Sequence, residues 1–434
     1  MLKVTRRYFR QFGVSGLFKT IVILSLLFGH LAAFASLRVQ TTMAGETSAK
    51  LGGVSAGEGH SYSALSNPAG LATLTGPAFS AGTSVIGVSL EGSQTNGLGN
   101  SPLSPPKDMS TTVWSLGAAT AGVGPWNRWW GLGAVLAGPY GSLQSFETNQ
   151  PNQVFPFRYQ GAEKQFQGTL SAALELVPNR LYFGAGLSLF ITAAGSADVS
   201  VITDNPTGNM ALNVKLNSAP LAGFLLTWER TRMSLVYRKG MAPSLREQFT
   251  GRVELGGEDV LQQPMLVEST LFFEPDEWDW EIEQRIGEMT LSAGLTYSQW
   301  RPYQHSYLVS STADQQGNRV STRIPSIVTQ NTISPRLGMQ WRWNTRWSLS
   351  SGYEFSPTPL VGVSQQALPA DGDTHRLGLG IQNQFWREGS RSASLGVHGQ
   401  FHWISEQTLS AGANESYRVS GQAHGIGLSL TARL

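Results

Sequence analysis

The C-terminal half of the chain is a series of segments of about ten residues in which apolar and polar side chains alternate with a period of two. The pattern is clearest in residues 336–344, 347–356, 376–385, 394–403 and 425–434. A period of two is that of a β-strand with one apolar face. About ten residues are enough for a tilted strand to cross a bilayer. Strands in lipid must form a closed barrel, because an open sheet edge would leave backbone groups unpaired.

The connections between these segments alternate in length. The short ones are residues 125–128, 178–180, 229–231, 284–288, 344–346 and 387–391. The long ones are residues 91–109, 141–163, 196–208, 239–264, 304–325, 357–373 and 407–416. Short periplasmic turns opposite long outer loops are typical of outer-membrane barrels. The sequence therefore predicts an all-β fold, a 14-stranded antiparallel transmembrane β-barrel with both chain ends in the periplasm, in preference to a soluble sandwich.

Residues 1–35 have the features of a signal peptide. Basic residues such as Lys3 and Arg7 precede an apolar run from Ile21 to Phe34, and Ala33-Phe34-Ala35 is an A-x-A cleavage site. The apolar run is too short to span a bilayer. Residues 5–10 also resemble a twin-arginine motif, but that route carries folded cargo, whereas a barrel must reach its membrane unfolded.

The charge balance and the absence of cysteine exclude several classes of function. The predicted signal peptide holds five of the 31 basic residues and none of the 29 acidic residues, so 26 basic residues remain against 29 acidic ones. No basic patch remains that would indicate a nucleic-acid partner. Without cysteine the chain has no disulfide, thiolate metal site or cysteine nucleophile. Beyond residue 35 no apolar run is long enough for a transmembrane helix.

The N-terminal segment, residues 36–76, is small, rich in glycine and poor in charge. Asn67-Pro68 predicts a turn, and Pro68 would remove a ladder donor from any strand. The segment has too little apolar surface for a domain of its own. We therefore expect irregular structure surrounded by a barrel formed by residues 77–434.

Short motifs in this segment and beyond it resemble a known family. They are Ser55-Ala56-Gly57-Glu58-Gly59, Asn67-Pro68-Ala69, Pro77-Ala78-Phe79, Gly138-Pro139-Tyr140-Gly141, Leu221-Ala222-Gly223, Leu235-Val236-Tyr237-Arg238, Tyr297-Ser298-Gln299-Trp300, Ser351-Gly352-Tyr353 and Thr374-His375-Arg376. In this order they resemble the FadL/TodX family of outer-membrane transporters of long-chain fatty acids and hydrocarbons.

The resemblance implies a function and a location. The N-terminal segment would be a hatch that plugs the barrel, with its centre at Asn67, Pro68, Ala69, Gly70 and Leu71. The barrel would lie in the bacterial outer membrane, as a monomer among outer-membrane lipids, and would take up hydrophobic small molecules passively. The resemblance implies neither an enzyme nor a cofactor.

A side exit is predicted in the third strand, at about residues 129–137. Gly131 and Gly133 weaken this strand, and Gly138-Pro139 ends it, so its pairing with a neighbour should be interrupted there. The resemblance implies a kink in this strand through which the ligand leaves laterally into the bilayer.

Two long loops have the composition needed to capture an apolar ligand. The loop of residues 141–163 carries Phe146, Phe155, Phe157 and Tyr159, and the loop of residues 239–264 carries Met241, Leu245, Phe249 and Leu261. Ordinary packing of the loops explains the same residues equally well.

Three groups of residues invite a catalytic or metal-site interpretation. Residues 53–57 fit G-x-S-x-G, but this motif needs a strand before it and a helix after it, and neither is predicted. His398 and His402 lie about 13 Å apart on one strand, too far to share a metal, which favours solvated histidines facing the lumen.

Asp279, Glu281 and Glu283 share one strand face, and Arg232 and Arg238 on the next strand favour ion pairs in the lumen over acid–base chemistry. The apolar phase changes at residues 274–275, which predicts a bulge. The remaining alternatives for function are a porin for polar solutes, a scaffold for secretion or surface anchoring, and a hydrolase embedded in the barrel.

Overall fold

The computed structural model describes the chain in sixteen ranges. They are residues 49–51, 56–57, 59–96, 99–102, 109–124, 128–140, 154–158, 166–202, 207–255, 258–270, 273–303, 309–313, 319–321, 327–363, 368–412 and 415–434. The predicted signal peptide and residues 36–48 of the N-terminal segment lie outside these ranges.

Fourteen of the described strands form a closed antiparallel barrel. In order around the barrel they are β1 (Ala78–Asn96), β3 (Met109–Val123), β4 (Trp129–Pro139), β6 (Gln167–Val177), β7 (Leu181–Ile202), β8 (Thr207–Trp228), β9 (Thr231–Arg238), β12 (Asp276–Ile286), β13 (Met289–Gln299), β17 (Thr332–Arg342), β18 (Trp347–Ser356), β21 (Thr374–Glu388), β22 (Arg391–Gly412) and β23 (Glu415–Arg433). The barrel closes where β1 pairs with β23, from Ala78 opposite Arg433 to Thr95 opposite Ser416. The predicted fold class is confirmed.

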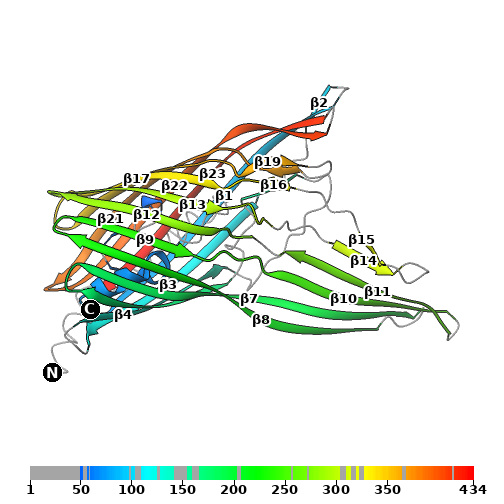
Figure 1. Cartoon of the computed structure of the whole chain (residues 1–434), viewed down its shortest axis with the longest axis horizontal. Coiled ribbons are helices and arrows are strands. Elements are labelled where there is room, and N and C mark those ends of the chain that lie inside the picture. Colours follow the sequence, from blue (N-terminus) through cyan, green and yellow to red (C-terminus); the bar gives the residue numbers. More distant parts are fainter. Residues whose placement is uncertain are drawn as a thin grey trace, which may run out of the picture.

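The two ends of the barrel differ (Figure 1). The end that we call the turn end carries the short connections and the C-terminus. Two of its turns are centred on Gly287 and Gly389, whose φ angles of +59° and +61° suit glycine better than any other residue. The opposite end, the loop end, carries the long connections. Each short turn falls where the sequence predicts it, to within about two residues.

The loop end contains more strand than the sequence predicts. Its additional strands are β2 (Gly99–Pro102), β5 (Val154–Pro156), β10 (Ser244–Leu255), β11 (Glu258–Thr270), β14 (Val309–Ala313), β15 (Arg319–Ser321), β16 (Ile327–Thr329), β19 (Leu360–Val363) and β20 (Leu368–Ala370). β7 and β8 extend beyond the barrel wall, and β10, β11, β14 and β15 continue their sheet (Figure 1). The predicted loops 196–208 and 239–264 are thus largely strands.

The predicted bulge at residues 274–275 is not within a strand. β11 ends at Thr270 and β12 begins at Asp276, and Glu274 between them makes an isolated bridge with Met241. The phase of the apolar residues changes there because β11 ends and β12 begins. It does not reflect an extra residue within a single strand.

The barrel strands turn apolar side chains outward and polar ones inward. On β17, Leu337 is 60% exposed and Trp341 is 39% exposed, whereas Arg336 on the opposite face of the strand is 3% exposed. Outward apolar residues recur on most of the barrel strands, such as Leu132, Leu170, Phe224, Trp280, Leu379 and Trp403. This outer surface suits lipid, and the barrel fits the bacterial outer membrane.

The described part of the N-terminal segment lies inside the barrel (Figure 1). It forms a one-turn helix, α4 (Ser63–Ser66), and a 3₁₀ helix, η2 (Pro68–Thr73), both against β4 and β6, with η2 also on β7 and β8. Asn67 caps η2, because its side-chain oxygen accepts a hydrogen bond from the Ala69 N–H. Among the described residues no helix is long and apolar enough to span a membrane.

A cysteine-labelling experiment checks the orientation. The chain has no natural cysteine, so Lys239→Cys at the loop end and Arg346→Cys at the turn end each give a single reactive site. We expect an impermeant maleimide to label the first variant on intact cells and the second only after permeabilisation. The reverse pattern would show that the turn end faces outward.

Candidate functional site in the barrel lumen

Glycines on the inner wall make room for the N-terminal segment, and four of them lie against Asn67 to Leu71. They are Gly131 and Gly133 on β4, Gly184 on β7 and Gly223 on β8. A Cβ on Gly133 would lie 2.7 Å from Leu71 Cδ2, and one on Gly184 would overlap the Pro68 backbone. Because each position leaves no space for a methyl group, the segment packs directly against the strand backbones.

Hydrogen bonds fix the segment in this position. Asn67 Nδ2 donates to the Phe224 carbonyl at 3.2 Å, and Ser171 Oγ donates to the Ala64 carbonyl at 2.7 Å. The Tyr62 and Ser115 hydroxyls are 2.8 Å apart. Arg238, which lies opposite Glu277 on β12, donates to the Ser66 carbonyl. The five residues predicted at the centre of the hatch are all buried at this junction.

The wall at the predicted side exit is continuous along most of β4. Its pairing with β3 runs from Trp129 to Pro139 without a register shift, and its pairing with β6 runs from Trp130 to Ala137. Within the described residues, Gly138 and Pro139 pair with β3 but not with β6. Any gap in the wall is therefore confined to the part of β4 after Ala137.

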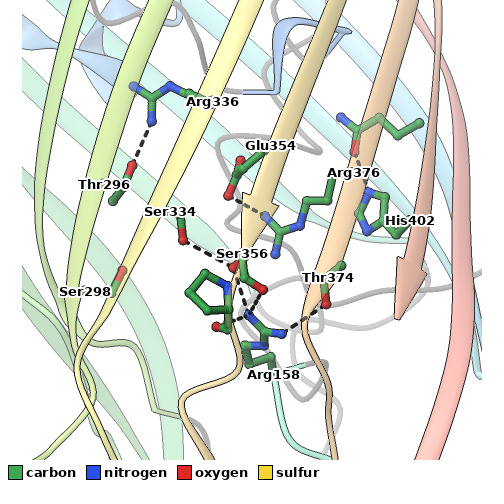
Figure 2. A network of polar contacts seen from close by, with 12 residues as sticks. Arg158, Thr296, Ser298, Ser334, Arg336, Glu354, Ser356, Thr374, Arg376 and His402 are labelled. Carbon is green, nitrogen blue, oxygen red and sulfur yellow. Dashed lines mark hydrogen bonds and ion pairs between the residues drawn. The ribbon is translucent and has the colours of Figure 1, made fainter. Parts of the chain in front are cut away.

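A network of buried charges crosses the inner wall on the opposite side (Figure 2). Arg336 Nη1 donates to Asp279 Oδ2 at 2.9 Å and to Thr296 Oγ1 at 2.7 Å. Its Nη2 donates to Asp279 Oδ1 at 2.6 Å and to Glu281 Oε2 at 3.0 Å. Ion pairs in the lumen are confirmed, although Arg336 is a partner that the sequence reasoning missed.

Gly294 explains how Arg336 reaches these carboxylates. Glu281, Gly294 and Arg336 lie opposite one another on β12, β13 and β17. A Cβ on Gly294 would lie 3.0 Å from the guanidinium, so the Arg336 side chain passes over β13 through space that only glycine leaves open.

The same row of residues continues on the next strands. Glu354 on β18 lies opposite Arg336 and accepts a hydrogen bond from Arg376 Nη1 at 3.2 Å (Figure 2). Arg232 Nη1 lies 3.8 Å from Glu283 Oε1, as the sequence predicts. Because buried charges are costly unless paired, the row ties β12 to β21.

His398 and His402 face inward as predicted but are not solvated. They are 5% and 1% exposed. His398 Nε2 lies 3.3 Å from Ser84 Oγ, and His402 Nε2 lies 3.3 Å from Gln400 Oε1. The packing of neighbouring inward side chains covers them, which the spacing along one strand cannot reveal. Among the described residues no cluster of His, Asp and Glu is arranged to hold a metal.

An aromatic cluster lies at the loop end. Phe157 is 4% exposed, and its ring centroid lies 4.6 Å from that of Tyr303 and 5.7 Å from that of Trp300. Phe273 contacts the same two rings at 5.2 and 5.9 Å. Met241 also packs against the buried core. Of the predicted capture residues, Phe157 is thus buried in the core of the loop end, and the partly buried Met241 from the other loop packs against it.

The neighbouring Arg158 fastens this cluster to the barrel (Figure 2). Its Nε donates to Asp371 Oδ1 at 2.8 Å, and its Nη atoms donate to Ser356 Oγ at 2.8 Å and to Thr374 Oγ1 at 3.0 Å. Burial raises the pKa of Asp371, and the Arg158 guanidinium opposes that effect.

The other predicted capture residues are placed less fully. Phe155 lies in β5, Leu245 and Phe249 lie in β10, and Leu261 lies in β11. Phe146 and Tyr159 lie outside the described residues, as does most of the G-x-S-x-G motif.

A polar cavity of about 1180 Å³ occupies the lumen at the turn end. The N-terminal segment forms one side of it, through Lys50, His60 and Ser61. Ser348, Gln382 and Thr431 on the barrel wall face it as well.

Acidification should loosen the N-terminal segment. Burial, together with the charges of Arg433 and Lys50, lowers the pKa of His60 to about 3. In the released segment His60 takes up a proton near its usual pKa of about 6.5. The docked state therefore loses stability as the pH falls below that value. We expect faster hydrogen exchange at residues 61–74 at pH 5 than at pH 7, after correction for intrinsic rates. His60→Asn should weaken this dependence, and equal protection of the native segment at both pH values would contradict it.

Comparisons with known proteins bear on the fold. No family model and no curated protein matches the chain. Among solved structures, a Pseudomonas aeruginosa FadL homologue is similar at a TM-score of 0.61 and 15% identity, over 92% of this chain and 99% of the other. The P. putida toluene transporter TodX is similar at a TM-score of 0.52 and 12% identity, over 93% of this chain and 99% of the other. The monoaromatic hydrocarbon channel CymD is similar at a TM-score of 0.52 and 14% identity, with the same coverage of the two chains. The chain therefore has the FadL/TodX fold.

Proposed function

We propose that the protein is an outer-membrane channel for passive uptake of hydrophobic small molecules, such as long-chain fatty acids or hydrocarbons. In this proposal the loop end faces outward, and the N-terminal segment is a hatch that closes the lumen. The solved structures with the same fold include a FadL homologue and a toluene transporter, which supports this class of substrate.

The observation that carries the proposal is the way in which the N-terminal segment is docked. Many of its contacts with the wall are to strand backbone or to small residues, such as Gly131, Gly184 and Ser171. A segment that rests on the strand backbones can leave the wall without breaking the pairing of the strands, which suits a hatch better than a structural plug.

The aromatic cluster at the loop end supplies an entry site for an apolar ligand. Phe157, Phe273, Trp300 and Tyr303 gather rings from three outer connections. Ring faces bury a large apolar area and hold acyl chains or aromatic molecules without charge. The loops that carry them would part when the ligand enters.

Lateral release would take place beyond Ala137. There β4 does not pair with β6. Gly138 lies against Phe166, and a Cβ added to Gly138 would be 3.5 Å from the Phe166 Cα. A hydrophobic ligand that leaves here enters the bilayer without crossing the polar cavity at the turn end.

Ligand binding tests the proposed function. Purified protein in neutral detergent should bind oleate or toluene saturably, because both can occupy an apolar site. Phe157→Ser should weaken the binding about tenfold or more, since a fully buried Phe contributes about 1.5–3 kcal/mol of apolar transfer. Phe385→Ser is the matched control, because Phe385 is 54% exposed on the outer surface.

The outcomes separate the proposal from its rivals. Loss of binding in the Phe157 variant alone supports the channel for hydrophobic molecules. If neither oleate nor toluene binds, the proposal fails, and steady permeation of sugars by the native protein would favour a porin for polar solutes. Export or surface display that depends on the protein, without ligand binding, would favour a scaffold.

A further inference from the structure

The cavity at the turn end is far more cationic than the chain as a whole. Its lining includes eight Lys and Arg residues but three Glu residues, whereas the whole chain has 31 basic and 29 acidic residues. The basic residues are Lys50, Arg230, Arg232, Arg285, Arg342, Arg346, Arg387 and Arg433. Positive charge is therefore concentrated at this one place.

Strand alternation places three of these arginines, Arg232, Arg285 and Arg342, on the inward face of the wall. On β12, Arg285 shares the face of the buried Asp279, Glu281 and Glu283. On β17, Arg342 shares the face of Arg336. Inward-facing side chains cannot reach lipid phosphates outside the barrel. Their presence is therefore not explained by the arginine belts that face lipid headgroups.

Few carboxylates neutralise this set of residues. Within the described part of the chain, one ion pair joins two of its lining residues, between Arg232 and Glu283 at 3.8 Å. Lys50 Nζ donates to Gln340 Oε1 at 3.0 Å, and Arg433 Nη2 donates to the Gly59 carbonyl at 3.4 Å. Both cations thus make neutral contacts and keep donors available to a further acceptor.

His60 is a second, independent indication of a ligand. Both ring nitrogens are buried at the cavity, and neither has a hydrogen-bond partner in the described structure. Arg433 and Lys50 lie close enough to depress its pKa. Burying an imidazole without partners beside two cations is costly, and an anion between them would supply both an acceptor and the missing negative charge.

We propose that this cavity binds a small hydrophilic oxyanion of the phosphate or carboxylate class at the junction of the N-terminal segment and the barrel. Arg342, Arg346 and Arg433 supply guanidinium forks, which match oxyanions. Lys50 and His60 contribute from the N-terminal segment, so the bound anion holds that segment to the barrel. Serine, threonine and glutamine line the rest of the cavity, which suits a hydrated anion better than an acyl chain.

Inorganic phosphate is the first probe, and the inference does not depend on which hydrophobic molecule the channel carries. Titration of the full mature chain in neutral detergent, at constant ionic strength, should give saturable heat by calorimetry. Phosphate should also raise the pKa of His60, followed by NMR of labelled histidine. Mixed micelles with phosphatidylglycerol form a second arm, which tells free phosphate from a lipid headgroup as the source.

Two variants separate the site from folding. Lys50→Gln/Arg433→Gln removes charge where the N-terminal segment meets β23, and Arg342→Gln/Arg346→Gln removes charge at the rim while leaving the contacts of that segment intact. Each should weaken phosphate binding about tenfold or more, because each lost charge-assisted hydrogen bond is worth about that factor. Arg180→Gln, on another turn at the same end, does not line the cavity and should bind like the native protein.

Saturable binding of inorganic phosphate that both double variants lose supports the site. Binding of phosphatidylglycerol alone would show that the arginines reach lipid headgroups and would contradict the inference. The inference is overturned if neither phosphate nor phosphatidylglycerol saturates, or if the double variants bind as well as Arg180→Gln does.

Discussion

Gly184→Val should open the lumen to polar solutes. The added side chain would occupy the space of the Pro68 backbone, so the N-terminal segment must move away from β7. Overpacking of this kind costs roughly 1–3 kcal/mol, which lowers the ratio of docked to released segment about fivefold to 150-fold. Valine itself favours strands, so the barrel should persist. The measurement is the rate at which cells admit a hydrophilic chromogenic β-lactam.

Gly399→Val is the matched control for this variant. Gly399 lies on β22, and a Cβ there meets the Gly425 carbonyl at an ordinary 3.6 Å. It makes the same residue change in a strand without touching the N-terminal segment. If both variants admit the β-lactam at the native rate, the segment does not close the lumen in the way we propose.

Arg336→Met should be the most destabilising single substitution that we consider in the barrel wall. It would leave Asp279 and Glu281 buried without their cation, and removing one partner of a buried ion pair costs about 3–5 kcal/mol. Urea unfolding in lipid vesicles, followed by the heat-modifiable mobility of the barrel, measures the loss.

A compensated variant tests the cause of this loss. Arg336→Met with Asp279→Asn and Glu281→Gln removes all three charges and should recover most of the stability, since neutral replacements of similar volume avoid the uncompensated charge. Arg346→Met, at the exposed turn, should change stability by less than about 0.5 kcal/mol. Equal stability of Arg336→Met and Arg346→Met would mean that the ion pairs contribute nothing.

The sequence predicts the barrel well because period-two alternation and turn residues are local signals. β17 and β18 lie where the alternation of Leu337 to Trp343 and Trp347 to Phe355 places them. The loop end was harder to predict, since polar residues such as Glu247 and Gln263 interrupt the apolar rows of β10 and β11.

The contacts in the lumen can be predicted only partly from the sequence, because some of them join strands that are not neighbours. The carboxylates of β12 and the pairing of Glu283 with Arg232 follow from adjacent strands. Arg336 escapes that reasoning, since it reaches over β13 through the gap at Gly294. The arginines of the polar cavity lie on five different strands and two turns, so their convergence appears only when the barrel closes.

Conductance in a planar bilayer tests the central claim most directly, namely that the N-terminal segment closes a channel for hydrophobic molecules. The full mature chain should conduct ions poorly, because the docked segment fills the lumen between β4 and β8. Deleting residues 36–70 should give a large and steady conductance. Large, steady conductance from the intact mature chain would contradict the account and would instead favour a porin for polar solutes.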